Sequence, residues 1–97
     1  MRERNELILS DLVAARAETQ PDRDVLTFEH WSLDGGATPD EVRTYSRLDA
    51  NARRIAAHLR SLGMQRGDRF ALVMRNHPEF VEAMLAASLG GWVFVPI

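Results

Sequence analysis

The fold of this 97-residue chain is decided by its last third, residues 67–97, which read GDRFALVMRNHPEFVEAMLAASLGGWVFVPI. Residues 69–74 form a short run with an apolar centre, and residues 92–97 form a second, strongly apolar run; both are typical of strands. The stretch between them is long enough for a helix. Strand, helix and strand in this order predict a βαβ unit, in which the two strands are parallel and the crossover is right-handed.

The helix inside this unit is predicted to be mostly buried. Asn76 or His77 can cap its start, Pro78 suits its first turn, and Gly90-Gly91 closes it. Apolar side chains cover most of its circumference: Phe80, Val81, Met84, Leu85, Ala87 and Leu89. A helix that is apolar nearly all round needs neighbours on several sides.

A second helix is predicted from Ser46 to Gly63. Its apolar stripe steps by four and three residues, through Leu48, Ala52, Ile55, Leu59 and Leu62. Ser46 with Asp49 resembles a capping box, and Gly63 suits a left-handed end. The arginines fall off the stripe, at Arg47, Arg53, Arg54 and Arg60. We expect them to form a solvated face rather than an anion-binding patch.

The first 45 residues predict a helix followed by a hairpin. Apolar residues at helical spacing indicate a helix over residues 7–19, which Ser10 or Asp11 could cap. Strands are predicted over Asp24–Trp31 and Val42–Tyr45. Turn-forming residues separate them, so we expect a hairpin with a long loop.

The composition argues against several classes of function but does not identify one. The net charge of −2 gives no electrostatic reason to expect binding to nucleic acid. All twelve basic residues are arginine, so lysine cannot serve here as a Schiff base or a phosphate ligand. The chain has no cysteine, which excludes disulfides and thiolate chemistry. No apolar run approaches the length of a membrane span, and we expect a cytoplasmic protein.

The sequence holds no recognisable catalytic constellation. The three histidines are far apart in the chain, at His30, His58 and His77, and no serine lies in a G-x-S-x-G elbow. Neither G-x-G-x-x-G nor G-x-x-x-x-G-K-[ST] occurs. The turn over residues 75–78 has the position at which open parallel sheets hold ligands, but helix capping explains it more simply. Glu79 and Glu82 are expected to form a solvated strip. We therefore assign no catalytic, cofactor-binding or metal-binding residue.

The predicted architecture is α/β, with a β-hairpin, three helices and one parallel βαβ unit. The chain stops inside an apolar strand, at Val95-Pro96-Ile97, which is typical of a piece of a larger fold. We expect an incomplete piece of one larger domain, without a second domain. The alternative is a stand-alone small α/β interaction or binding module, which would be non-enzymatic and would cover its last strand by another means, such as dimerisation.

Five blocks of sequence resemble the adenylate-forming (AMP-binding) superfamily of acyl-CoA synthetases and ligases. Residues 43–48 (RTYSRL) resemble x-T-Y-x-x-L, and residues 51–63 resemble the helix N-x-x-A-x-x-L-x-x-x-G. Residues 67–72 (GDRFAL) resemble G-D-R-V-A-L, and residues 76–80 (NHPEF) resemble N-x-x-E-F. Residues 85–97 resemble the segment that ends in V-x-V-P-L. No single block is specific, but their order and spacing together are.

The resemblance extends upstream and shows small departures. Residues 12–23 are similar to the family's opening helix and its x-P-D-R-x-A turn. Ser88 and Leu89 precede the glycine of the last block, and Gly91-Trp92 stands where alanine is commoner. The segment from Trp31 to Asp40 is longer and more polar than in many relatives.

The resemblance implies a ligase that activates a carboxylate with ATP and Mg²⁺ to an acyl-adenylate and then transfers it to CoA. In this family the residues that grip phosphate, magnesium and ribose lie downstream of the V-P strand, so none is carried over to this chain. Residues 1–97 are then the N-terminal part of the large AMP-binding domain, in a ligase with a place in fatty acid metabolism. The implied partners are the remainder of the synthetase chain and a small-molecule carboxylate. The segment by itself is expected to bind neither ATP nor CoA and to be inactive.

Overall fold

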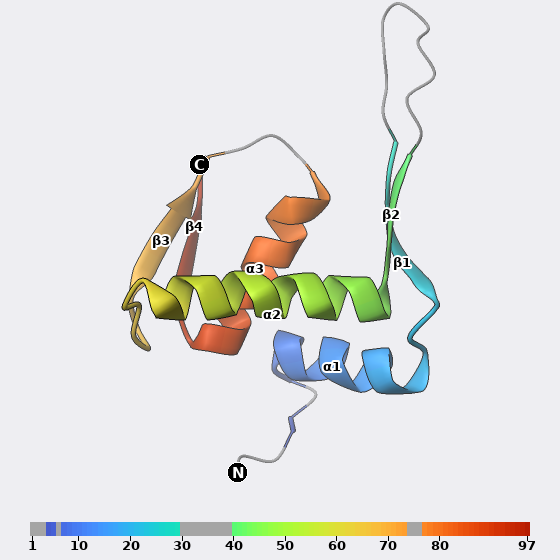
Figure 1. Cartoon of the computed structure of the whole chain (residues 1–97), viewed down its shortest axis with the longest axis horizontal. Helices are drawn as coiled ribbons and strands as arrows, with labels where there is room; N and C mark the ends of the chain where they lie inside the picture. Colours follow the sequence, from blue (N-terminus) through green and yellow to red (C-terminus); the bar gives the residue numbers. More distant parts are fainter. Residues whose placement is uncertain (1–3, 6, 30–39, 74–76) are drawn as a thin grey trace, which may run out of the picture.

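The computed structural model describes residues 4, 5, 7–29, 40–73 and 77–97 (Figure 1). The elements follow one another as α1 (Leu9–Thr19), β1 (Asp24–Phe28), β2 (Glu41–Thr44), α2 (Tyr45–Ser61), β3 (Arg69–Leu72), α3 (Pro78–Gly90) and β4 (Val93–Pro96). Helix α2 runs across the centre, with one pair of strands at each of its ends (Figure 1). This confirms the predicted α/β class, with three helices, a hairpin and a parallel pair. Among the described residues, no helix has both the length and the apolar character needed to cross a membrane.

The hairpin β1–β2 is antiparallel, as predicted, and is short. Its register pairs Asp24 with Thr44 and Phe28 with Glu41, with an irregularity between Asp24 and Leu26. The predicted strand over residues 24–31 ends at Phe28 in the structure, and its last two residues lie outside the described part. Strand β2 ends at Thr44 rather than Tyr45, because Tyr45 already belongs to the next helix.

Helix α2 begins one residue earlier than predicted, and its cap is different. Thr44 is the N-cap, and its hydroxyl accepts a hydrogen bond from the backbone N–H of Arg47 at 3.2 Å. The capping box predicted from Ser46 and Asp49 is therefore wrong. Asp49 instead pairs with Arg53 one turn later, at 2.9 Å. The predicted left-handed glycine after the helix is confirmed, since Gly63 has a φ of 96°.

Helix α1 also differs from its prediction at the start. It begins at Leu9, and its N-cap residue Ile8 contributes no side-chain cap. Ser10 and Asp11, which were expected to cap it, are buried inside its first turn. The Asp11 carboxylate accepts from the backbone N–H of Asn5 at 2.8 Å, so it holds the preceding segment against the helix.

The predicted βαβ unit is confirmed. Strands β3 and β4 are parallel, with Arg69 opposite Val93 and Leu72 opposite Pro96. Helix α3 joins them, with Pro78 in its first turn and Gly91 left-handed at its end. His77 occupies the N-cap position without a side-chain hydrogen bond, and Asn76, the other predicted cap, lies outside the described residues.

Two apolar clusters hold the helices and strands together. The first joins α1, α2 and α3 through Val13, Leu48, Ala52 and Leu85. The second joins α2 and α3 to the turn before β4 through Ala56, Ala86, Ala87 and Trp92, and Phe70 of β3 and Phe94 of β4 pack against it. The predicted stripe on α2 is thus confirmed except at its end, because Leu62 is exposed after the last turn.

Candidate functional site: the Arg43–Glu82 network

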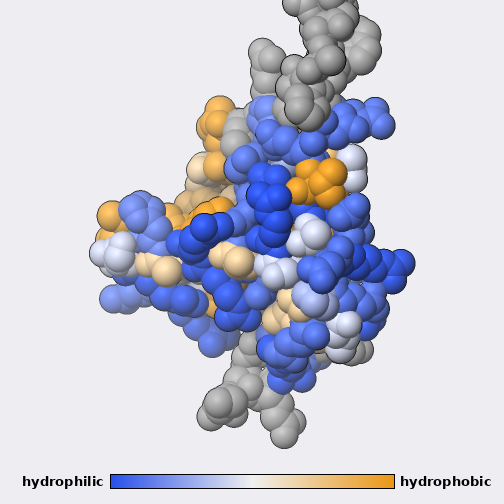
Figure 2. Space-filling view, turned by 45° about the vertical axis from the view of Figure 1, so that its right-hand side comes forward, coloured by the Kyte–Doolittle hydropathy of each residue, from blue (hydrophilic) through white to orange (hydrophobic). Residues whose placement is uncertain are grey.

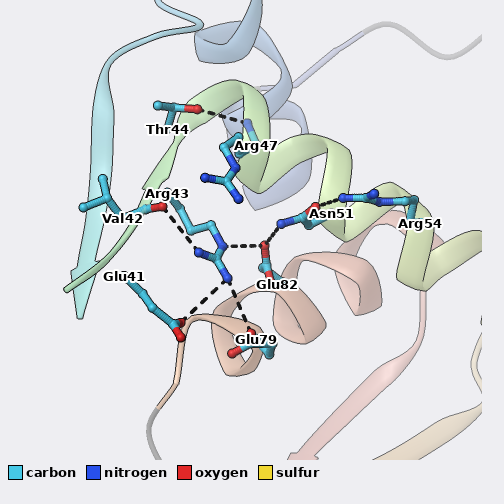
Figure 3. A network of polar contacts seen from close by, with 9 residues as sticks. All are labelled: Glu41, Val42, Arg43, Thr44, Arg47, Asn51, Arg54, Glu79 and Glu82. Carbon is cyan, nitrogen blue, oxygen red and sulfur yellow. Dashed lines mark hydrogen bonds and ion pairs between the residues drawn. The ribbon is translucent and has the colours of Figure 1, made fainter. Parts of the chain in front are cut away.

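A network of charged and amide side chains joins three elements at the hairpin end of α2 (Figure 3). Strand β2 supplies Arg43, helix α2 supplies Asn51, and helix α3 supplies Glu79 and Glu82. Arg43 follows the irregular pairing of the hairpin, and its side chain points toward α3 (Figure 3). Residues that are distant in sequence are therefore tied by polar contacts as well as by the apolar clusters.

Glu82 is the centre of this network. Its side chain is only 3% exposed, and its carboxylate accepts from Arg43 Nε at 3.3 Å and from the Asn51 amide. Arg54 donates in turn to the Asn51 carbonyl oxygen, which fixes the orientation of that amide. A buried carboxylate is tolerated when it has a charge partner and further hydrogen-bond donors, and Glu82 has both.

Arg43 is nearly as enclosed, with a side chain that is 12% exposed. Besides Glu82, it reaches Glu79 at 3.4 Å, Glu41 at 3.8 Å and the Val42 carbonyl at 3.3 Å. Three carboxylates around one guanidinium leave few of its N–H donors for a ligand. The geometry therefore suits a structural anchor between the hairpin and α3 rather than a binding site.

The expectation of a solvated strip on α3 is wrong for Glu82 and right for Glu79, whose side chain is about half exposed. Sequence reasoning failed because the partners of Glu82 lie on β2 and α2, more than thirty residues earlier in the chain. The available signal was the position of Glu82, which lies beyond the first turn of α3 among residues that are otherwise apolar. Such a residue needs a partner when the helix is buried on all sides.

A second set of contacts closes the other end of α3. Arg60 of α2 donates to the Leu89 carbonyl at 3.1 Å, and its guanidinium lies 5.6 Å from the ring centre of Trp92. The ring also packs so closely on Gly90 that a Cβ there would lie 2.4 Å from it. The arginine face of α2 is exposed as predicted, and Arg60 additionally ties α2 to the end of α3.

The other residues that the sequence analysis considered for a site do not lie together in the described structure. His58 is exposed on α2, His77 is at the start of α3, and His30 lies outside the described residues. Ser88 of α3 faces Ser10 of α1, with their hydroxyl oxygens 3.0 Å apart. Of the turn over residues 75–78, only His77 and Pro78 are described.

The described residues enclose no ligand-sized cavity, and no group of three or more of their His, Asp or Glu side chains is arranged to hold a metal ion. That the segment carries no catalytic, cofactor-binding or metal-binding residue of its own stays a prediction.

Comparison with known proteins identifies the wider family. Residues 13–97 match the family described as AMP-binding enzyme. A 4-coumarate–CoA ligase of Humulus lupulus is 48% identical over 59 residues, which are 61% of this chain and 11% of that protein. A second one, 4-coumarate–CoA ligase 4 of Arabidopsis thaliana, is 37% identical over 89 residues, which are 92% of this chain and 15% of that protein.

A solved structure agrees in fold. The fatty acid AMP ligase of Legionella pneumophila superimposes with a TM-score of 0.81 at 32% identity, over 92% of this chain and 14% of that one. The chain thus spans only about a seventh of this structure and of the Arabidopsis ligase, and about a ninth of the Humulus ligase. With the family match reaching from Val13 to Ile97, the chain belongs to the AMP-binding enzyme family, as a segment similar to the N-terminal part of its adenylate-forming ligases.

Proposed function

We propose that this chain is the N-terminal part of the large domain of an acid–CoA ligase that forms AMP. Such an enzyme joins a carboxylate to the α-phosphorus of ATP, releasing pyrophosphate, and the thiol of CoA then displaces AMP from the acyl-adenylate. The observation that carries this proposal is the 48% identity to a protein described as a 4-coumarate–CoA ligase. A second CoA ligase that matches over 92% of the chain supports it.

The segment itself has a structural role in this proposal. Helix α3 is held at one end by the Arg43–Glu82 network and at the other by Trp92 and Arg60. Both ends of the βα crossover are therefore fixed against α2. ATP and Mg²⁺ serve the adenylation step of the family, and CoA serves those members that are CoA ligases. In this proposal the residues of the segment take part in no chemical step.

A second candidate is a ligase whose acceptor is not CoA. It is favoured by the superposition on a protein described as a fatty acid AMP ligase, which covers 92% of this chain. The fold of the segment is common to both candidates. The two differ in the acceptor of the acyl group, so an assay of the acceptor distinguishes them.

A chimera tests the proposal. Residues 13–97 replace the matching segment of the Arabidopsis 4-coumarate–CoA ligase, and AMP release is measured with 4-coumarate, ATP and CoA. We expect the folded chimera to form the CoA ester, because the segment would supply the same scaffold. A matched chimera in the Legionella ligase is assayed for acyl-adenylate.

The outcomes separate the candidates. Activity of the Arabidopsis chimera supports the CoA ligase, and activity of the Legionella chimera alone favours the second candidate. If both chimeras fold and neither releases pyrophosphate in a carboxylate-dependent way, the ligase proposal is overturned. The non-enzymatic interaction module would then be the better reading. The 97-residue chain alone is expected to release no AMP in the same assay.

A further inference from the structure

The solvent side of α2 carries its arginines in two rows. Arg47 and Arg54 are two turns apart on one flank of this side, and Arg53 and Arg60 are two turns apart on the other. All four arginines are exposed. We call these four residues, with the short side chains that lie between the two rows, the arginine face of α2.

Only small residues lie between the two rows. At about 100° per residue, the positions between them are those of Ser46, Ala50, Ala57 and Ser61, and all four are exposed. Residues three and four apart are neighbours on a helix surface, so Ala50 and Ala57 each lie among arginines of both rows. The arginine face is therefore a lane of short side chains between two rows of long, basic ones.

The positive charge of this face is largely uncompensated. The only acidic residue of α2 is Asp49, which pairs with Arg53 at 2.9 Å. Arg54 and Arg60 donate to neutral oxygen atoms, of an amide and of a backbone carbonyl. Within the described part of the chain, Arg47 has no carboxylate at ion-pairing distance, and its backbone N–H makes the contact drawn in Figure 3. Three of the four guanidinium groups are thus available to an anionic partner.

The excess of positive charge is local to this part of the chain. Residues 43–69 hold seven arginines and two acidic residues, although the whole chain has a net charge of −2. Figure 2 shows a mainly hydrophilic surface over the helices. A surface with a local excess of one sign attracts partners of the opposite sign and speeds their association. An acidic partner therefore complements the arginine face.

The residues between the rows distinguish the kinds of acidic partner. A membrane-binding helix presents large apolar side chains to the lipid, whereas this lane holds alanine and serine. Short side chains instead let the backbone of a second helix come close, and arginines on both flanks can then reach carboxylates on both sides of that helix. The same face of a second copy is disfavoured, because arginine would lie against arginine.

We propose that the arginine face of α2 docks an acidic α-helix of another protein, whose carboxylates lie in two rows that match the arginines. Arginine suits this role because its planar guanidinium binds a carboxylate through two parallel hydrogen bonds. The inference goes beyond the ligase proposal and does not depend on it, because it concerns a surface that this chain forms by itself.

Two matched peptides test the inference. The probe is an alanine-rich helical peptide of about 20 residues that carries glutamates in two rows, spaced as the arginines are. The control peptide has glutamine at the same positions, and circular dichroism checks that both are helical. Each peptide is labelled with fluorescein, and its binding to the 97-residue chain is measured by fluorescence anisotropy at about 20 mM and about 150 mM salt.

We expect the glutamate peptide to bind at least about tenfold more tightly than the glutamine peptide at low salt, and less tightly as salt is raised. R47Q/R54Q removes one row of the arginine face and should weaken binding about tenfold, which corresponds to about 1.4 kcal/mol. R16Q/R23Q removes the same charge from exposed positions outside the face and should change binding less than about twofold. Equal binding of the two peptides, or equal losses in the two variants, would overturn the inference.

A further variant tests the helical shape of the partner. A50L/A57L keeps every arginine but enlarges the side chains between the rows, and should weaken binding of the glutamate peptide about tenfold. Unchanged binding would overturn docking of a helix on this lane. NMR of the unmodified chain gives an independent readout: the amide signals of Ala50 and Ala57 should shift when the glutamate peptide is added, and shifts confined to other residues would overturn the inference.

The competing partner is an anionic membrane. Vesicles of phosphatidylglycerol are sedimented with the 97-residue chain and with R47Q/R54Q. We expect no binding that requires these two arginines. Vesicle binding that is lost in R47Q/R54Q, together with no binding of the glutamate peptide, would assign the arginine face to a membrane and overturn the inference.

Discussion

The two pairs of strands, at opposite ends of α2, are attached to the helices by different physical means. The hairpin β1–β2 is anchored to α3 by charge, through Arg43 and Glu82, with Glu79 in addition. The pair β3–β4 is anchored by apolar packing of Phe70, Phe94 and Trp92. The hairpin end of the molecule is therefore anchored by contacts within the chain. At the other end, only the face of β3–β4 that carries Phe70 and Phe94 is packed, and the opposite face is exposed.

The largest expected effect comes from breaking the charged anchor. R43M removes the cation from a carboxylate that is 3% exposed, and leaving a buried charge unpaired costs about 3–5 kcal/mol. We expect a loss of this size in the free energy of unfolding, measured by urea denaturation. R53M, on the exposed face of α2, is the control and should change it by less than about 0.5 kcal/mol. Similar effects of both variants would show that the network is not an anchor.

The next-largest effect distinguishes the buried core from the exposed face of β3–β4, which carries Val93 and Val95. L85A creates a cavity where α1, α2 and α3 meet, at a side chain that is 2% exposed, and should cost about 2–5 kcal/mol. V95A removes methyl groups that are already in contact with solvent, and should change stability by less than about 0.5 kcal/mol in the isolated chain. Urea denaturation of both variants measures the difference. A large loss of stability from V95A would mean that the exposed face of β3–β4 is packed in the isolated chain.

The junction of α3 with β4 is tested by G90A. A Cβ at Gly90 would lie 2.4 Å from the ring of Trp92, so the ring has to move. Overpacking of this kind costs about 1–3 kcal/mol, partly offset by the better helix propensity of alanine, which is worth about 1 kcal/mol. In a W31F background Trp92 is the sole tryptophan, and its emission should shift to longer wavelength. Unchanged emission and stability would contradict the close packing.

A smaller effect is expected where the hairpin passes into α2. T44A removes the hydroxyl that accepts from Arg47 N–H, which should cost about 1 kcal/mol. S46A, the position that the sequence favoured as the cap, should have little effect because Ser46 is exposed in the first turn of the helix. The midpoint of thermal unfolding of both variants compares them directly. The reverse order would restore the capping box predicted from the sequence.

The smallest effect lies outside both strand pairs, at the ion pair of Arg4 and Glu18. The Nη2 atom of Arg4 is 2.6 Å from the Oε1 atom of Glu18. The hydrogen bond from Arg4 lowers the pKa of the Glu18 carboxyl below its ordinary value of 4.5. A lowered pKa means that the pair stabilises the fold above that ordinary value, and that this contribution is lost as pH falls through the lowered one. NMR titration of Glu18 should show its pKa rising in R4A, whereas an unchanged value would mean that the pair does not form in solution.

The fold was predictable where local signals agree with the tertiary environment. Leu48 and Ala52 on α2, Pro78 at the start of α3, and the left-handed Gly63 all followed from spacing and backbone preference. The parallel pairing of β3 and β4 followed from the order of the elements, since neighbouring strands joined by a crossover helix are normally parallel.

Predictions from the sequence were wrong where a residue's hydrogen-bond or charge partner lies on another element of the fold. Ser46 and Thr44 are both residues that cap helices well. Thr44 is the cap because it is the last paired residue of the hairpin, and its extended backbone is the geometry that an N-cap residue needs. Asp11 was read as a cap, but its carboxylate holds the backbone of Asn5. Glu82 was read as solvated, but β2 and α2 bring Arg43 and Asn51 to it. Local periodicity carries no information about such contacts.

The crossover between β3 and β4 also sets an order of assembly during synthesis. The hairpin and α2 can form as soon as they emerge, but β3 has no partner strand until all of α3 has been made. At about 5–20 residues per second, the roughly 24 residues from Arg69 to Val93 take about one to five seconds. For that interval Phe70 and Leu72 belong to an unpaired apolar segment. The nascent chain is therefore most open to chaperone binding, and to association with its neighbours, at β3.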